Sequence, residues 1–348
     1  MRFVFTEEQR IFQRTVRDFL AKAFPPEELR ASWAGATGRS RERWAQLAAL
    51  GAAGMLVPSD AGGLGMDEVD MVLLLEEAGR AALPEPIVET SVVATRLLSA
   101  LAPPEGRGVW LPAIARGDAW IAVGLEGGGP YVADAHVADL LLLQRGDALH
   151  AVDPADVHLT AQPSVDGAQH MFTVDWNPTA ATELAGGEAA EAALAEAFDR
   201  AASGVAAQLV GLADRMIEMA ADHARQREQF GQPIGSFQAV KHLLANALLK
   251  LDFARPAVYR AAWSMAHQAG DAALRARDAS IAKAYASEAA TAAAGVALQV
   301  HGAIGYTWEH DLHLWMKRAW ALAGAWGDAA WHRERVASWL LGPGEATQ

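Results

Sequence analysis

The stretch that decides how this chain is organised is residues 225–234, RQREQFGQPI, which separates two long segments of helical periodicity. Arg225 and Arg227 stand just before an aromatic–glycine turn, Phe230-Gly231. Two arginines here could clamp a phosphate, because a guanidinium binds phosphate through paired hydrogen bonds. The same residues also suit a helix C-terminus, where basic side chains meet the negative dipole end and a glycine closes the helix. Spacing alone favours this second interpretation.

The segments on either side of this stretch carry apolar stripes that recur with a period of 3.6 residues, as amphipathic helices do. The stripe before it contains Leu209, Leu212, Ala213, Met216 and Ala220, and the stripe after it contains Val240, Leu243, Leu244, Ala247, Leu248 and Leu251. We expect Pro256 to kink or end the second helix. Residues 278–300 and 315–341 read as further helices. Long helices joined by short breaks predict an antiparallel bundle over 188–348.

The N-terminal part also reads as helical. Thr6 and Gln9 form a predicted capping box, and the helix that follows is expected to end at Pro25-Pro26. Helical periodicity continues over 41–50, 67–82 and 90–101. These features predict an N-terminal helical domain over residues 1–117.

The period changes in the middle of the chain. Short apolar runs at 120–123, 140–143 and 171–174 are bounded by Gly, Asp and Pro, which is the pattern of β-strands. We therefore predict a small β-barrel-like domain over 118–187. The expected fold class is α+β, mainly α, with the C-terminal bundle over 188–348.

Composition excludes several classes of protein. The chain has 348 residues, a formal net charge of −13, 52% hydrophobic residues and no cysteine. The apolar fraction is too high for a disordered chain, and the lack of cysteine excludes disulfides and thiolate chemistry. An acidic surface disfavours nucleic acid, which needs a basic face. Neither a signal peptide nor a membrane span is visible, so we expect a cytoplasmic protein.

A second glycine-containing stretch, residues 299–307 (QVHGAIGYT), ends another predicted helix. Its glycines could let the backbone approach a ligand, although an ordinary helix-to-helix turn has the same composition. His301, His310 and His313 lie in and after this stretch. Their spacing matches no zinc site, so we expect structural histidines and no metal. The glycine-rich turns at 62–65 and 127–129 do not match the dinucleotide fingerprint.

Taken together, these pieces resemble the acyl-CoA dehydrogenase family over nearly the whole chain. The resemblance is carried by residues 5–9 (FTEEQ), 62–65 (GGLG), 76–80 (EEAGR), 227–238 (REQFGQPIGSFQ) and 299–307. In the last of these, Ala303 stands where the family often has a second glycine.

The resemblance implies an FAD bound between subunits, and hence an oligomer, either homomeric or heteromeric. It assigns Arg227, Phe230 and Gln238 to the dinucleotide of a neighbouring chain. It assigns Gln299 and Gly302 to the adenine end. The phosphate-clamp interpretation of Arg227 thereby becomes the favoured one.

The family's reaction is also implied. A carboxylate removes the proton alpha to an acyl-CoA thioester while the flavin accepts a hydride from the beta carbon, giving a trans-2-enoyl-CoA. Such a base must sit within hydrogen-bond reach in a dry pocket. The implied partners are the acyl-CoA substrate and an electron-transfer flavoprotein. The implied setting is fatty-acid or steroid side-chain catabolism.

The sequence departs from the family where the catalytic glutamate is expected. The matching C-terminal stretch, residues 325–331 (AWGDAAW), contains no glutamate, and the alternative position falls on Ala201. Asp328 and Asp199 are the nearest carboxylates. For both we favour helix capping or a solvated face over catalysis, so the catalytic residue is left unassigned.

The predicted β domain departs as well. The family's Thr-Glu-Pro-x-x-Gly-Ser-Asp stretch contacts flavin and substrate, but residues 123–131 read VGLEGGGPY and lack most of its hydroxyl and carboxylate groups. The chain is also a few tens of residues short for the family, mostly in this domain.

Three hypotheses follow. The chain is a working dehydrogenase with an unusual base, or a non-catalytic subunit that completes the FAD site of a homologous partner, or a flavin-free helical scaffold. The missing glutamate favours the second hypothesis, and retention of residues 227–238 counts against the third.

Overall fold

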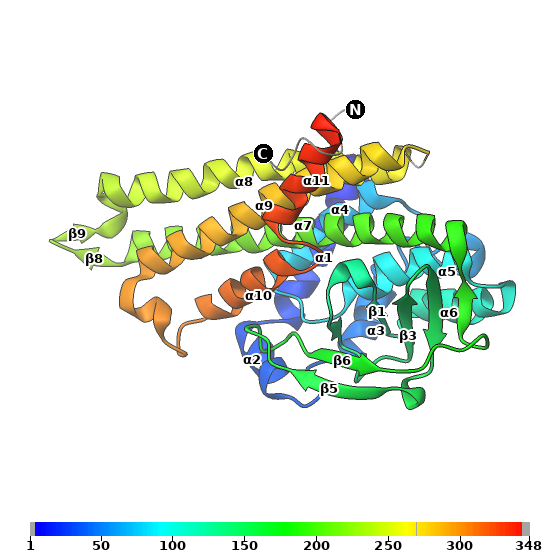
Figure 1. Ribbon diagram of the computed structural model, residues 1–348. Coiled ribbons are helices and arrows are strands. Elements are labelled where there is room, and N and C mark those ends of the chain that lie inside the picture. The colour runs from blue at the N-terminus through cyan, green and yellow to red at the C-terminus, as the bar shows by residue number, and fades with distance from the viewer. Residues whose placement is uncertain (1–3, 269, 343–348) are drawn as a thin grey trace.

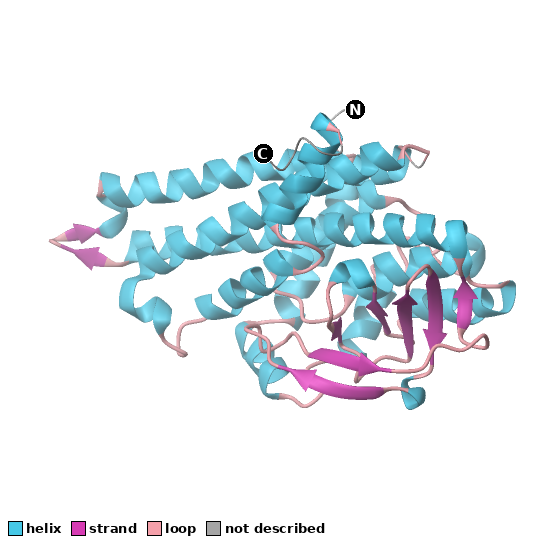
Figure 2. Ribbon diagram, in the orientation of Figure 1, coloured by secondary structure: helices cyan, strands magenta, loops and turns pink. Residues whose placement is uncertain are grey.

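The protein is described by a computed structural model, in which residues 4–268 and 270–342 are placed. It is mainly helical, with a small β region between two sets of helices (Figure 2). This is the α+β, mainly α fold that the sequence predicts. Among the described residues, none of the helices combines the length and apolar character that a membrane crossing needs.

The N-terminal helices begin with the predicted capping box. Thr6 Oγ1 accepts a hydrogen bond from the Gln9 backbone N–H (3.2 Å), and Gln9 Oε1 accepts one from the Thr6 N–H (2.8 Å). The helices are α1 (Glu7–Ala23), α2 (Pro26–Ala34), α3 (Arg41–Ala49), α4 (Glu68–Arg80), the π-helix η2 (Ile87–Ala94), α5 (Thr95–Leu101) and α6 (Pro104–Arg116).

Two features of this region differ from the sequence prediction. Pro25 and Pro26 end α1, but they also start α2, because a proline is tolerated in the first turn, where its missing N–H is not needed. The segment 90–101 was expected to be one α-helix. Instead a π-helical stretch precedes α5, and periodicity does not distinguish these wider turns from an ordinary broken helix.

The β region contains two small sheets. One has the order β1 (Ile121–Gly124), β3 (Leu140–Arg145), β4 (Ala148–Val152) and β7 (Glu183–Ala185), and the other has β2 (Val132–Ala133), β6 (Met171–Asp175) and β5 (His158–Gln162). Strands β1 and β3 are parallel, with Ile121 opposite Leu140. The three predicted apolar runs are confirmed as β1, β3 and β6. Sequence reasoning missed the more polar strands, such as β5.

The C-terminal helices are α7 (Gly187–Gln226), α8 (Gln238–His267), α9 (Ala272–His301), α10 (Leu312–Gly324) and α11 (Ala329–Leu341). Strands β8 (Glu228–Gln229) and β9 (Gln232–Pro233) form a hairpin between α7 and α8. In Figure 1, α7, α8 and α9 run side by side, and the hairpin projects from one end of them. This arrangement agrees with the predicted bundle.

Helices α4 and α7 cross with their backbones in contact. A Cβ added at Gly79 would lie 1.9 Å from the Gln208 carbonyl oxygen, and one added at Gly211 would lie 1.8 Å from the Glu76 carbonyl oxygen. Only glycine allows this approach. The crossing joins the N-terminal helices rigidly to the long α7, which carries residues of the candidate site.

Helix α8 departs from the prediction in two ways. Of the two outcomes expected at Pro256, a kink or an end, the end does not occur: α8 continues through Pro256, and Ala254 and Val258 on either side are buried. Its predicted apolar stripe is only half buried. Ala247 and Leu251 are buried, whereas Leu248 is exposed on the outer face of the bundle.

Candidate functional site

The five residues that the resemblance assigns to flavin contact lie at one end of the helical bundle. Arg227, Phe230 and Gln238 belong to the β8–β9 hairpin and the start of α8, and Gln299 and Gly302 lie at the end of α9. All five are exposed, and 92% of the Phe230 surface is accessible. The Phe230 backbone adopts a positive φ of 55°, which places its ring at the hairpin tip.

Histidines hold the ends of α7 and α9 together beneath these residues. The rings of His223 and His301 stack with centroids 4.4 Å apart, and His310 packs against His301 at 4.5 Å. His301 Nδ1 donates a hydrogen bond to the Ala297 carbonyl (2.7 Å). Burial lowers the pKa of His301 to about 4, so these stacked imidazoles are neutral near pH 7 and do not repel one another. The structural role expected for His301 fits this geometry.

This end of the bundle lies away from the β region. Figure 1 shows the β8–β9 hairpin projecting beyond the long helices, at the opposite end from strands β1 and β3. The exposed side chains of Arg227 and Phe230 are therefore free to contact a neighbouring molecule.

The structure brings together the two other stretches that the resemblance singles out. Residues 123–131, after β1, and the loop between α10 and α11 enclose a cavity of about 230 Å³. We call it the Trp326 cavity. Its lining residues are Glu89, Val123, Leu125, Gly128, Gly129, Pro130, Tyr131, Ala133, Gln169, Met171, Ala321, Gly324, Ala325 and Trp326.

Trp326 stands in the stretch where the family has its catalytic glutamate. The residue is 6% exposed, and its backbone has a positive φ of 55°. A Cβ added at Gly128 would lie 2.9 Å from the indole ring, so the ring packs directly on that glycine. Phe198 meets the ring edge-on, with centroids 6.0 Å apart. A large apolar side chain therefore lies in the stretch that the resemblance matches to the family's glutamate segment.

Lys283 fixes the loop that carries Trp326. Its side chain is fully buried, and its Nζ donates hydrogen bonds to the carbonyls of Ala323 and Gly327, both at 2.9 Å, and to Ser287 Oγ at 3.2 Å. Burial lowers the pKa of Lys283 to about 7, with Asp328 opposing the shift. The lysine thus satisfies one carbonyl in the last turn of α10, which the helix itself leaves free, and one in the loop that follows.

The two aspartates nearest to the family's base positions have structural partners. Asp328 caps α11 by accepting a hydrogen bond from the Trp331 N–H (2.8 Å), as the capping interpretation predicts. Asp199 is buried, and Arg335 Nη1 donates to it at 2.5 Å. It is therefore an internal ion pair and not the solvated residue that the sequence suggested. Neither aspartate lines the Trp326 cavity.

Sequence reasoning missed Glu89, which is the only carboxylate lining the Trp326 cavity among the described residues. It lies on the π-helix η2 and is half-buried. Burial raises its pKa, while a hydrogen bond from its own backbone N–H acts in the opposite direction. The prolines at 84 and 86 mark this segment as irregular, but no spacing in the sequence marks Glu89 itself.

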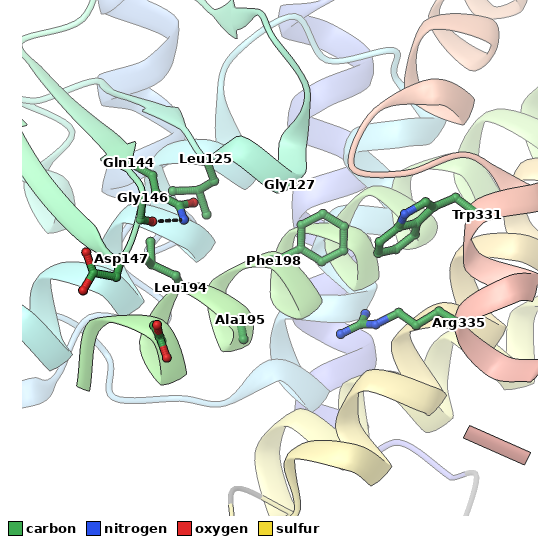
Figure 3. A pocket seen from close by; sticks show the side chains of 11 residues that line it. Leu125, Gly127, Gln144, Gly146, Asp147, Leu194, Ala195, Phe198, Trp331 and Arg335 are labelled. Atoms are coloured by element: carbon green, nitrogen blue, oxygen red, sulfur yellow. Dashed lines mark hydrogen bonds between the residues drawn. The ribbon is translucent and has the colours of Figure 1, made fainter. Parts of the chain in front are cut away.

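A second, larger cavity of about 460 Å³ lies between the β3–β4 hairpin and helices α7 and α11 (Figure 3). Leu125 lines both this cavity and the Trp326 cavity. Phe198 and Trp331 form an aromatic wall, with centroids 5.2 Å apart. Figure 3 shows Arg335 below these rings and Asp147 on the hairpin side, so the lining is apolar with charges at its edge.

An open cavity of about 660 Å³ adjoins the other side of the Trp326 cavity, because Gly324 lines both. Lys250 and Arg333 are the cations that line it, together with the carboxylates Glu288 and Asp328. Arg333 forms an ion pair with Glu288. The Trp326 cavity is thus flanked by an apolar cavity on one side and a charged cleft on the other.

Sequence comparison matches two parts of the chain to family models. Residues 6–118 match the acyl-CoA dehydrogenase N-terminal domain, and residues 191–341 match the acyl-CoA dehydrogenase C-terminal domain. The chain is 32% identical over 318 residues to acyl-CoA dehydrogenase IpdE2 of Mycolicibacterium smegmatis, covering 90% of this chain and 93% of that protein. It is 33% identical to IpdE2 of Mycobacterium tuberculosis, covering 90% and 91% of the two chains.

Solved structures share the fold. The ChsE4–ChsE5 complex of Mycobacterium tuberculosis contains a chain with a TM-score of 0.87 and 26% identity, covering 98% of this chain and 99% of that one. A glutaryl-CoA dehydrogenase of Mycobacterium smegmatis, solved in complex with FADH2, has a TM-score of 0.84 at 18% identity, covering 97% and 95%. At that identity the second likeness shows the fold alone.

Proposed function

Because this chain belongs to the acyl-CoA dehydrogenase family, we propose that it takes part in the FAD-dependent α,β-dehydrogenation of an acyl-CoA thioester. The observation that carries the proposal is the Trp326 cavity. It is formed by the two stretches, 123–131 and 325–331, to which the resemblance assigns flavin contact and proton removal.

The residues around this cavity fit a flavin. Gly128 and Gly129 present backbone without side chains, and the walls formed by Val123 and Met171 are apolar, which excludes water. Beyond Gly324, the adjoining cleft offers Lys250 and Arg333 to a diphosphate. When bound, FAD supplies the hydride acceptor.

In this proposal the Trp326 cavity holds only the reacting parts of the flavin and of the acyl-CoA thioester. Its volume of about 230 Å³ is smaller than the roughly 300–1,000 Å³ of complete ligand sites. The 460 Å³ cavity that shares Leu125 would take part of the thioester substrate, with Phe198 and Trp331 packing against its apolar portion.

We infer that the flavin site is shared between chains. Arg227 and Phe230 are exposed at the hairpin, which lies at the opposite end of the long helices from β1, the strand that contributes Val123 to the Trp326 cavity (Figure 1). They would therefore contact a dinucleotide held mainly by a neighbour, with Gln238, Gln299 and Gly302 beside them. Electrons would then pass to an electron-transfer flavoprotein, and the assembly would work in the cytoplasm.

A second candidate function is that of a non-catalytic subunit, which completes the FAD site of a homologous partner and has no active site of its own. The observation that favours it is the absence of a carboxylate at both family positions, occupied by Ala201 and the Trp326 loop. The ChsE4–ChsE5 complex of Mycobacterium tuberculosis, which contains a chain of the same fold, is consistent with such pairing.

The visible spectrum of the purified protein tests these proposals. The chain would be produced alone and together with homologous acyl-CoA dehydrogenase chains from the same source. Flavin absorbance that acyl-CoA bleaches in the protein alone supports a homomeric dehydrogenase. Flavin that appears only in a mixed assembly supports the heteromeric form. A colourless protein in every pairing would contradict both.

A further inference from the structure

We propose that Glu89 is the catalytic base, whose carboxylate accepts the α-proton of an acyl-CoA thioester bound in the Trp326 cavity. This inference rests on the proposed dehydrogenase function. Both positions at which the family carries its catalytic glutamate lack one in this chain. Glu89 would supply the carboxylate from a different element, the π-helix η2.

The placement of Glu89 is fixed by its neighbour in the chain. Thr90 Oγ1 accepts a hydrogen bond from the Ile121 N–H (3.0 Å) and donates one to the Ile121 carbonyl (3.2 Å). These two bonds tie η2 to β1, the strand that leads into the 123–131 stretch. Helix η2 also packs against α7. Glu89 therefore lies next to a residue that is anchored to β1, and such positioning is what proton transfer requires.

The local backbone supports this placement. π-helical turns are rare, and they appear most often at functional sites. The wider turn over Ile87–Ala94 shifts the register of side chains between Pro86 and α5, so that Glu89 lines the cavity while Thr90 faces β1.

Among the described residues, the Glu89 carboxylate forms no hydrogen bond or ion pair with another side chain. The two cations that act on it electrostatically have partners of their own: Arg39 is bound to Asp134 (2.5 Å), and Arg318 to Asp166 (2.6 Å). Both cations still lower the pKa of Glu89 from a distance, whereas burial and Asp134 raise it. Burial is the largest effect, so the carboxylate is a stronger base than one in water.

The chemistry balances as follows. The Cα–H bond of the thioester breaks, and its proton goes to a Glu89 carboxylate oxygen. The electron pair forms the Cα–Cβ double bond as a hydride leaves Cβ for the flavin, which is reduced while the thioester is oxidised to the enoyl-CoA. Glu89 releases its proton to solvent after the product leaves.

The test compares Glu89→Gln, Glu89→Asp and Glu85→Gln in the complete flavin-containing assembly. Glu85 is the matched control, because it is also a buried carboxylate with a raised pKa (about 7), four residues away, but it does not line the Trp326 cavity. Three quantities are measured: bound flavin, dehydrogenation rate, and exchange of the substrate's α-proton for deuterium in D2O. Thermal melts check that each variant is folded.

We expect Glu89→Gln to slow both dehydrogenation and α-exchange by about 100-fold or more, the usual contribution of a general base. Flavin content would stay unchanged, Glu89→Asp would retain partial activity, and Glu85→Gln would resemble the unmodified protein. An infrared titration of the ligand-free protein supplies a readout independent of turnover. The titration should lose one carboxyl group with a raised pKa in Glu89→Gln.

The remaining outcomes overturn the proposal in distinguishable ways. If the assembly holds flavin and turns over, but Glu89→Gln keeps its rates, Glu89 is not the base, and the dehydrogenase function stands with its base on the partner. If the unmodified protein binds no flavin in any assembly, the proposed function fails, and the role of Glu89 fails with it.

Discussion

The buried Nζ of Lys283 donates a 2.9 Å hydrogen bond to the carbonyl of Gly327, and this bond ties α9 to the loop that carries Trp326. The loop needs such an anchor because Trp326 and Gly327 both adopt positive φ values. A charged amine buried without a carboxylate partner at hydrogen-bond distance is unusual. The Lys283 side chain is therefore one of the anchors of this loop, together with His332, which contacts the Trp326 carbonyl.

Lys283→Met should change how stability depends on pH. The pKa of Lys283 is lowered to about 7 in the folded protein, from 10.5. Between these values the unfolded chain binds more protons, so this residue makes the free energy of unfolding rise as pH increases from about 7 to 10. Denaturant unfolding at several pH values should show a smaller rise in Lys283→Met. An identical slope in both proteins would contradict the burial of a charged amine.

His301→Gln should reduce sensitivity to acid. Burial lowers the pKa of His301 to about 4, below its value in the unfolded chain. The unfolded chain therefore binds more protons between pH 6.5 and 4, and stability contributed by the neutral ring is lost as pH falls through that window. Urea midpoints at pH 7 and pH 4.5 should differ less in the variant. His267, exposed and stacked on Trp263, provides a control position.

Arg227→Ala should remove flavin from the assembly while leaving the chain folded. The side chain is exposed, so its loss removes no packing, whereas a guanidinium at a diphosphate supplies charge-assisted hydrogen bonds. Arg225→Ala is the matched control. That residue is two positions away, equally exposed, and pairs with Asp222. Full flavin occupancy in Arg227→Ala, measured by absorbance after gel filtration, would remove this residue from the cofactor site.

Gly128→Ala should destabilise the protein by about 1–3 kcal/mol, the usual cost of overpacking. The new methyl group would lie 2.9 Å from the Trp326 ring. Gly108→Ala in α6 is the control, since a Cβ there meets nothing within 4 Å. We expect Trp326→Leu to restore part of the stability lost in Gly128→Ala. Additive effects of the two substitutions, measured in a double-mutant cycle, would show that residues 128 and 326 are not in contact.

Much of the fold could be predicted because its signals are local. The Thr6–Gln9 capping box, the start of α7 near Gly187 and the runs that became β1, β3 and β6 all depend on residues close together in the chain. The alternative that Pro256 ends its helix was wrong, because buried neighbours such as Ala254 and Val258 keep α8 packed on both sides of the proline. The π-helix at Ile87–Ala94 was missed because its wider turns leave no distinct period.

The candidate site also has features that the sequence could predict and features that it could not. The motif over residues 227–238 could be recognised because a short continuous stretch carries it, and its contact with flavin stays a prediction. Asp199 and Asp328 could be found as candidates, but their partners could not, since Arg335 lies 136 residues from Asp199 along the chain. Nothing local distinguishes Glu89 from the other acidic residues on helices.

The sequence by itself determined the family, the order of helical and β regions, and the absence of a glutamate where the family keeps its base. Periodicity, capping and short motifs carry that information over a few residues. Only the tertiary structure decided that Trp326 packs on Gly128, that the Arg227 hairpin points away from its own cavity, and that Glu89 lies inside it. The Gly128–Trp326 contact joins residues 198 positions apart in the chain (326 minus 128). All three features depend on how distant segments such as α7, α9 and β1 pack, which no local pattern encodes.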